Sequence, residues 1–250
     1  MTATLSRSVY LRSLYSRQSA FTLLELMLSC ALGLLLLTGL IQAYFAAKKN
    51  FILQDAIVSS SESGQFASHF LTREILMAGY AGCGDEFVDQ NAAIEGYQNN
   101  LPAFLQGKVA AGTDSIMIGR CRSENGKEEF SQHAFIISVT SRKNALGNKI
   151  LSLYEAPVDG DKQELVSDVT TMKISYGITD EKGEDIVAYL PALQVEDWRM
   201  VRAVEIALLV SSEQPVYSNP QPYYFAGQSM PPDRFLHGEF DVYVALRERE

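Results

Sequence analysis

The 250-residue sequence is poor in histidine, cysteine and tryptophan, with three histidines, three cysteines and one tryptophan. The histidines, His69, His133 and His237, stand singly, and each is interpreted as structural or exposed. No GxSxG motif, HExxH motif or phosphate-binding loop occurs. The acidic turns at 159–161 and 180–185 lack the ligand spacing of an EF-hand and are predicted to be solvated. The sequence therefore predicts no catalytic residue, no cofactor and no metal.

Basic residues are also scarce, because 21 Lys and Arg stand against 30 Asp and Glu, for a net charge of -9. Binding to phosphate backbones needs clustered Lys and Arg, so the composition argues against a nucleic-acid partner. The distribution is uneven: Arg7, Arg12 and Arg17 lie in the first twenty residues, which contain no acid. A basic tip on an acidic body indicates that the two ends face different compartments.

Charge is absent altogether from Leu26 to Ala47. As a helix this stretch would be roughly 33 Å long, which is enough to cross the hydrocarbon core of a membrane. A secretory signal has a shorter apolar core followed by a cleavage site, so a retained membrane helix is the favoured interpretation. More basic residues precede the stretch than follow it, which predicts a cytoplasmic N-terminus and everything after Lys48 on the outer side.

Glu25 stands at the start of this apolar stretch and has two interpretations. Thr22-x-x-Glu25 is a capping box, and an acid in the first turn suits the helix dipole. An ionisable residue at the edge of a membrane span is also a functional candidate, because its charge needs a partner in that setting.

The residues Ser19 to Met27, after a basic leader and before the long apolar helix, resemble the prepilin signal of type IV pilins and type II secretion pseudopilins. The resemblance implies that a prepilin peptidase cuts between Ala20 and Phe21 and methylates the new amino group of Phe21. Glu25 would then be the fifth residue of the mature chain, where it could meet the Phe21 amine of a neighbouring subunit and set the register between them. The sequence departs from the family at Ala20, where the family usually has Gly.

Beyond the membrane stretch the sequence keeps a helical rhythm as far as Ala78, and Gly79 and Gly82 are expected to end the helix. The predicted organisation is a removed leader (1–20), a transmembrane and filament-core helix (21–48), the outer half of the same helix (49–79) and a periplasmic globular domain (80–250). The segment from Phe66 to Cys83, with Arg73-Glu74, Ala78-Gly79-Tyr80 and Cys83, resembles the PilW family of minor pilins more narrowly.

Cys83 and Cys121 both lie on the outer side of the predicted membrane, where an oxidising periplasm permits a disulfide. Metal ligation is the competing interpretation, but neither cysteine has a nearby CxxC or histidine partner. Cys121 stands where the PilW resemblance would place a partner for Cys83. Cys30 lies inside the apolar stretch and is interpreted as a small apolar residue.

Short alternating segments after residue 112 predict an antiparallel sheet packed on the long helix, and therefore an α+β fold of the pilin type. The expected strands are 115–119, 134–140, 149–155, 172–178, 185–190, 203–210 and 239–246, with a short helix at 195–200 and turns at 144–148 and 180–183. Residues 91–112 and Pro215 to Pro232 are interpreted as loops. The aromatic cluster Tyr217, Tyr223, Tyr224 and Phe225 in the second loop fits either a partner-binding surface or loop packing.

These patterns together predict a PilW-like minor pilin that contributes to the initiation and tip of type IV pili. The implied partners are other minor pilins, the major pilin, prepilin peptidase and the inner-membrane assembly platform. The implied location is the inner membrane, with one span and the C-terminal domain in the periplasm, and then the pilus. A GspJ-like minor pseudopilin of type II secretion is the alternative, and a membrane-anchored periplasmic enzyme or ligand-binding protein is a more distant one.

Overall fold

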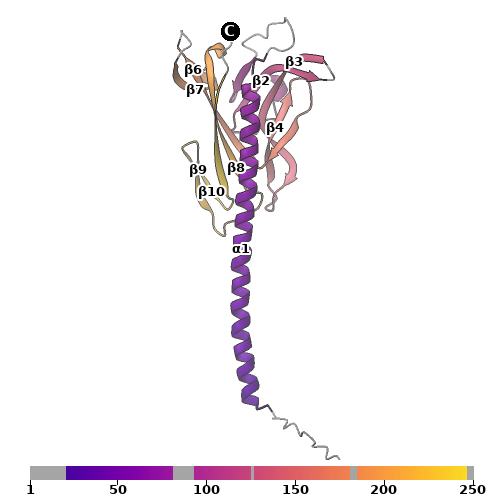
Figure 1. The fold of residues 1–250 in the computed structure, drawn as a ribbon, viewed down its shortest axis with the longest axis vertical. Helices are drawn as coiled ribbons and strands as arrows, with labels where there is room; N and C mark the ends of the chain where they lie inside the picture. The colour runs from indigo at the N-terminus through magenta and orange to yellow at the C-terminus, as the bar shows by residue number, and fades with distance from the viewer. Residues whose placement is uncertain (1–20, 81–92, 125–126, 181–184, 247–250) are drawn as a thin grey trace, which may run out of the picture. The chain divides into compact units, whose positions relative to one another are not determined.

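The computed structural model describes residues 21–80, 93–124, 127–180 and 185–246 (Figure 1). The chain divides into two compact units, with the division between Lys48 and Lys49. One helix and two antiparallel sheets make up most of the described structure, so the predicted α+β class is confirmed.

Helix α1 spans Leu23–Leu76 and runs through Ser59-Ser60-Ser61 without interruption. Its end is a short turn in which the Ala78 amide donates to the Ile75 carbonyl, and Gly79 then takes a φ of 74°. Glycine adopts this left-handed conformation at little cost, which explains why the helix stops here. The helix predicted from Phe21 to Ala78 is therefore two residues shorter at each end.

The first sheet is a five-stranded antiparallel meander, in which each strand pairs with the next along the chain. Its strands are β1 (Ile94–Tyr97), β2 (Ser115–Glu124), β3 (Lys127–Lys143), β4 (Lys149–Pro157) and β5 (Gln163–Ser167). The predicted turn between β3 and β4 is confirmed. The Asn144 side chain accepts hydrogen bonds from the amides of Leu146 and Asn148, at 3.0 Å each.

The second sheet has four antiparallel strands in the order β11-β8-β6-β7, and a separate hairpin is formed by β9 and β10. The strands are β6 (Val169–Thr179), β7 (Ile186–Pro191), β8 (Val201–Ser211), β9 (Gln221–Phe225), β10 (Gln228–Asp233) and β11 (His237–Ala245). Short 3-10 helices lie at Ala103–Leu105 (η2), Ala192–Gln194 (η3) and Trp198–Met200 (η4). The helix predicted over 195–200 is thus reduced to its second half.

The outer part of α1 packs against both sheets. Ala67, Leu71 and Ile75 are fully buried, and their spacing of four residues puts them on one face of the helix. They share one core with Phe135 of the first sheet and Met172 of the second. Burying a leucine or isoleucine side chain contributes about 1.5–3 kcal/mol, so this face holds the outer part of the helix against the two sheets.

A glycine allows the helix and β11 to approach closely. A Cβ atom at Gly64 would lie 2.2 Å from the ring of Phe240, so only glycine leaves room for that ring against α1. Gly64 lies on the face of α1 that packs against the sheets. Its place there is explained by this close contact, although a glycine inside a helix costs about 1 kcal/mol relative to alanine.

Two segments interpreted as loops contain strands, so those interpretations are wrong in part. Residues 91–112 include β1 and η2, and Pro215 to Pro232 includes β9 and most of β10. Strand β1 has only four residues and is defined by its pairing with the distant β2. The hairpin of β9 and β10 was not predicted because its prolines argue against a strand except at the edge of a sheet. Its two-residue turn is formed by Ala226 and Gly227, which both have positive φ.

Candidate functional site

The first turn of α1 is capped by Thr22. Its side-chain oxygen accepts a hydrogen bond from the Glu25 amide at 3.3 Å, and its carbonyl accepts one from Leu26 at 3.2 Å. This arrangement satisfies amide groups that the helix itself leaves unpaired. In the part of the chain that the structure describes, no hydrogen bond or ion pair is formed by the Glu25 carboxylate itself.

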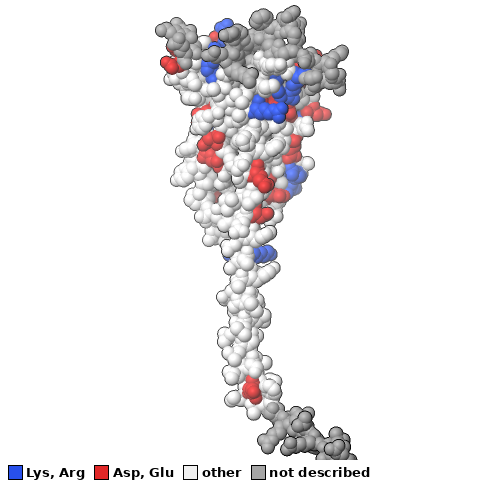
Figure 2. Space-filling view, in the orientation of Figure 1, with Lys and Arg blue, Asp and Glu red and all other residues white. Residues whose placement is uncertain are grey.

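The charge-free part of α1 has no protein cover within its own unit and appears white in Figure 2. Its most apolar 18-residue window has a mean hydropathy of 2.2 and is 0% buried. The hydroxyls of Ser29 and Thr38 donate back to the carbonyls of Glu25 and Leu34, at 2.8 Å each. Polar groups satisfied within the helix are compatible with lipid, where no water is available to bond them.

A buried ionic cluster lies at the other end of α1. Arg120 donates through Nη2 to both carboxylate oxygens of Glu74, at 2.6 and 2.7 Å, and the Glu74 side chain is 6% exposed. Arg122 donates to the same carboxylate at 2.8 Å. Because Arg120 and Arg122 are two residues apart on β2, they lie on one face of the strand and reach the helix together.

The cluster continues across the first sheet to Glu155 on β4. Arg122 contacts the Glu155 carboxylate at 2.9 Å, and His133 of β3 contacts it at 2.8 Å. The hydrogen bond from His133, and then the nearby Arg122, hold the pKa of Glu155 below its usual range. Burial lowers the pKa of Arg120, although Glu74 opposes that change.

The composition of the cluster indicates a structural role. Two arginines are balanced by two carboxylates, so the charges that burial would otherwise penalise are paired. The sequence interpretation quoted Glu74 only as part of a basic–acidic pair and missed its partners. A signal was present, because Glu74 lies seven residues after the buried Ala67 and therefore falls on the buried face of α1.

The histidines are structural or exposed, as predicted. His69 is exposed, and His133 is 8% exposed within the cluster. His237 stacks on Tyr223 at 3.7 Å between ring centroids, and its ring nitrogens contact Asp233 and Ser211 at 2.8 Å each. Among the described residues, no group of three His, Cys, Asp or Glu side chains could hold a metal ion.

Two of the four aromatic residues that the sequence interpretation left open, Tyr223 and Phe225, are packed against the protein. Phe225 is 3% exposed and Tyr223 packs on His237, so these two rings serve loop packing. Tyr224 is 67% exposed.

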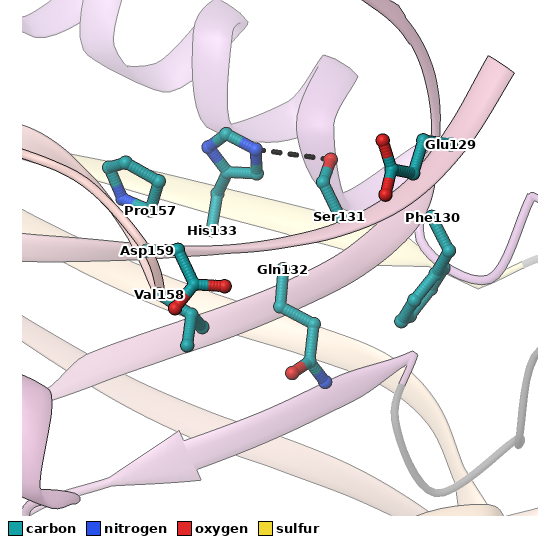
Figure 3. Close-up of a pocket in the computed structure, with 8 residues that line it drawn as sticks. All are labelled: Glu129, Phe130, Ser131, Gln132, His133, Pro157, Val158 and Asp159. Atoms are coloured by element: carbon teal, nitrogen blue, oxygen red, sulfur yellow. Dashed lines mark hydrogen bonds between the residues drawn. The ribbon is translucent and has the colours of Figure 1, made fainter. Parts of the chain in front are cut away.

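A surface hollow of about 360 Å³ lies beside His133. Figure 3 shows Ser131 and His133 on one side of β3, joined by a hydrogen bond of 3.1 Å, with Phe130 and Gln132 on the other side. The His133 ring lies between the Ser131 hydroxyl and the Glu155 carboxylate, and Glu155 is shared with Arg122 of the ionic cluster.

Cys121 is buried in β2 between the two arginines of the cluster, at 7% exposure. Its amide donates to the carbonyl of Tyr80 at 2.9 Å, so the chain segment three residues before Cys83 is bonded to Cys121. Cys83 itself lies outside the described residues, and the bridge between the two stays a prediction. Cys30 is a free, exposed cysteine on α1.

We expect thiol alkylation to distinguish the three cysteines. Under denaturing conditions without reductant, protein isolated from the cell envelope should take up one alkyl group, on Cys30. After reduction it should take up three, because Cys83 and Cys121 are then released. Intact mass gives the count directly, and three groups before reduction would exclude the bridge. On the loop-entropy model the bridge would stabilise the fold by about 4 kcal/mol.

Two separate regions of the chain each match a known protein family model. Residues 15–41 match the prokaryotic N-terminal methylation motif. Residues 134–248, from the middle of β3 to the end of the second sheet, match the family model of the type IV pilus-assembly protein W. No curated protein sequence matches the chain.

The fold is also similar to that of a type IV-like pilin from Thermus thermophilus. The two share 13% sequence identity with a TM-score of 0.43, over 74% of this chain and 94% of the other. The methylation motif includes the capped start of α1, and the PilW match covers the second sheet and the first sheet from the middle of β3 to β5. Residues 134–248 thus match the PilW family and residues 15–41 the methylation motif, and the two matches together indicate a minor pilin of type IV pili.

Proposed function

We propose that prepilin peptidase cuts this chain between Ala20 and Phe21 and methylates the Phe21 amine. The residues that follow the cut support this proposal, because Phe21 and Thr22 precede the first helical residue, Leu23. The new amino group would thus stand at the free end of α1, beside its own helix cap. Ala20 is close in size to the glycine that the family usually carries here, so a peptidase pocket for a small residue would still accept it.

The chain then remains in the inner membrane as a single span, residues 21–48, with residues 49–250 in the periplasm. The charge-free, exposed helix supports the span, and the excess of arginine in the leader supports the orientation. Residues 49–79 form the outer half of the helix, and residues 80–250 form the globular domain. From the membrane the subunit enters the pilus.

In the pilus we assign the chain to the initiation and tip complex, together with other minor pilins and next to the major pilin. The assembly platform of the inner membrane would receive it. Glu25 would set the register by pairing with the methylated Phe21 amine of a neighbour. The single observation that carries this role is a carboxylate at the start of an apolar helix with no partner among the described residues of its own chain.

Pilins are structural subunits, and no catalytic activity is proposed for this chain. A GspJ-like role in type II secretion shares the N-terminal signal, but the PilW match over residues 134–248 favours the pilus. The two roles differ in a deletion strain. Loss of pili with normal secretion supports the PilW role, and a secretion defect in a strain that keeps its pili contradicts it.

Processing is tested by intact-mass measurement of the membrane-bound protein. The unaltered chain should lack residues 1–20 and carry one added methyl group. The double variant Ala20→Arg, Phe21→Arg should stay at precursor mass, because two bulky cations cannot enter a site for a small residue and a phenylalanine. Ala20→Gly is the matched control and should be processed at least as fully as the unaltered chain. Normal cleavage of the double variant would contradict the proposal.

A further inference from the structure

Strand β7 forms one edge of the second sheet and carries an unusual amount of exposed apolar surface. It pairs with β6 on one side, and in the described part of the chain no strand pairs with its other side. Ile186, Val187 and Tyr189 are 42%, 64% and 47% exposed, and Leu193, just beyond the strand, is 61% exposed. A long apolar edge with free backbone groups is a template for pairing with another strand.

The other described edges carry features that discourage such pairing. Edge strand β5 has an ion pair between Glu164 and Arg142, and β11 carries Glu239 and Asp241. The hairpin has Pro222 in β9, and Pro231 and Pro232 in β10. Strand β1 has only four residues and contacts η3. Charge and proline are usual protections of an edge, and β7 has no charged residue and no proline until its last residue, Pro191.

The charge around β7 restricts the partner. No Asp, Glu, Lys or Arg occurs in residues 186–195, whereas residues 49–250 carry 17 basic and 29 acidic residues. An uncharged strand facing an apolar edge avoids burying an unpaired charge. Two copies of this acidic body repel each other, so the charge distribution favours a different subunit over a second copy.

We propose that β7 is a docking edge, to which an extended, uncharged segment of another pilus subunit adds as a further strand. Pro191 has no amide hydrogen, so the pairing covers residues 186–190, about 17 Å of strand. Backbone hydrogen bonds would hold the added strand, and Val187 and Tyr189 would contact its side chains. The inference rests on the proposed function only in taking the partner to be another subunit of the pilus.

Site-specific photo-cross-linking in piliated cells tests the proposal. A benzophenone amino acid in place of Tyr189 should give an adduct between this chain and another pilus subunit. The matched control carries the same group in place of Tyr243, which is 67% exposed on β11, the opposite edge of the same sheet. That control should give no such adduct. Mass spectrometry of the adduct identifies the partner segment, which should be extended and free of charge.

A second pair of variants changes Val187 while the cross-linking group stays at position 189. Val187→Lys, combined with the group at position 189, should lower the adduct about tenfold, because the interface would then bury an unpaired cation. Val187→Thr keeps a β-branched, uncharged side chain and should retain most of the adduct. Equal thermal melting points of the two variants would show that folding is not the cause.

Three results would overturn the proposal: an adduct with a second copy of this chain, an adduct within the chain to residues 81–92, or no adduct in cells that have normal pili. The N-terminal mass of the same sample distinguishes failure of the docking proposal from failure of the proposed function. A processed, methylated chain without an adduct rejects the docking edge alone. An unprocessed chain would instead contradict the proposed maturation.

Discussion

Replacing Glu74 with leucine is expected to lower the free energy of unfolding by about 3–5 kcal/mol, the range measured when one partner of a buried ion pair is removed. The carboxylate is contacted by Arg120 and Arg122. Without it, Glu155 would be the one carboxylate of the cluster left to balance two partly buried guanidinium groups. Denaturant unfolding of the full chain in detergent, followed by circular dichroism, gives the change in free energy.

The same substitution at Glu62 is the matched control. Glu62 lies on the same helix but is exposed, so its replacement should change the free energy of unfolding by less than about 0.5 kcal/mol. Adding Arg120→Leu to Glu74→Leu should recover part of the loss, because one of the unpaired cations is then removed. Equal effects of Glu74→Leu and Glu62→Leu would mean that the cluster contributes nothing beyond surface charge.

Replacing Glu25 with leucine should abolish or strongly reduce entry into the pilus while leaving cleavage and membrane insertion intact. The carboxylate is not needed for insertion, since an acid at mid-bilayer costs roughly 2.5–3.5 kcal/mol and its removal favours the membrane. Pairing with a neighbour's amine would offset that cost only when the subunits are correctly staggered, so the proposed pair would act as a register device. Counting pili by electron microscopy in a complemented deletion strain measures the effect.

Thr22→Val separates registration from capping. This variant removes the side-chain oxygen that accepts from the Glu25 amide and keeps the carboxylate. Loss of such a cap costs about 1 kcal/mol of helix stability, which should leave assembly largely intact. If Glu25→Leu restored pili as fully as Thr22→Val, Glu25 would serve only the first turn of the helix. Glu25→Gln, with nearly the same shape and no charge, should behave like Glu25→Leu.

The strands show where sequence patterns suffice and where they do not. Strands β6, β8 and β11 were predicted because their alternation or apolar runs are long and local. Strands β1 and β5 and the β9–β10 hairpin were missed. Strand β1 is four residues long, and prolines interrupt the alternation of the hairpin. These short strands are stabilised by burial, as of Phe225, and by pairing with other strands. The local sequence does not indicate which strand will be the pairing partner.

The N-terminal segment is the part of this protein that the sequence by itself determined. A basic N-terminal stretch, a small residue, Thr22, Glu25 and a charge-free helix act through their order along the chain, so spacing alone indicates a membrane-anchoring helix and the methylation motif of prepilins. The ionic cluster and the exposed β7 edge were decided only by the tertiary structure. Glu74 meets arginines that lie 46 and 48 residues away, and β7 is an edge only because of the strand order of its sheet. The cluster and the edge both depend on which distant segments the folded chain brings together, and a local sequence pattern does not contain that information.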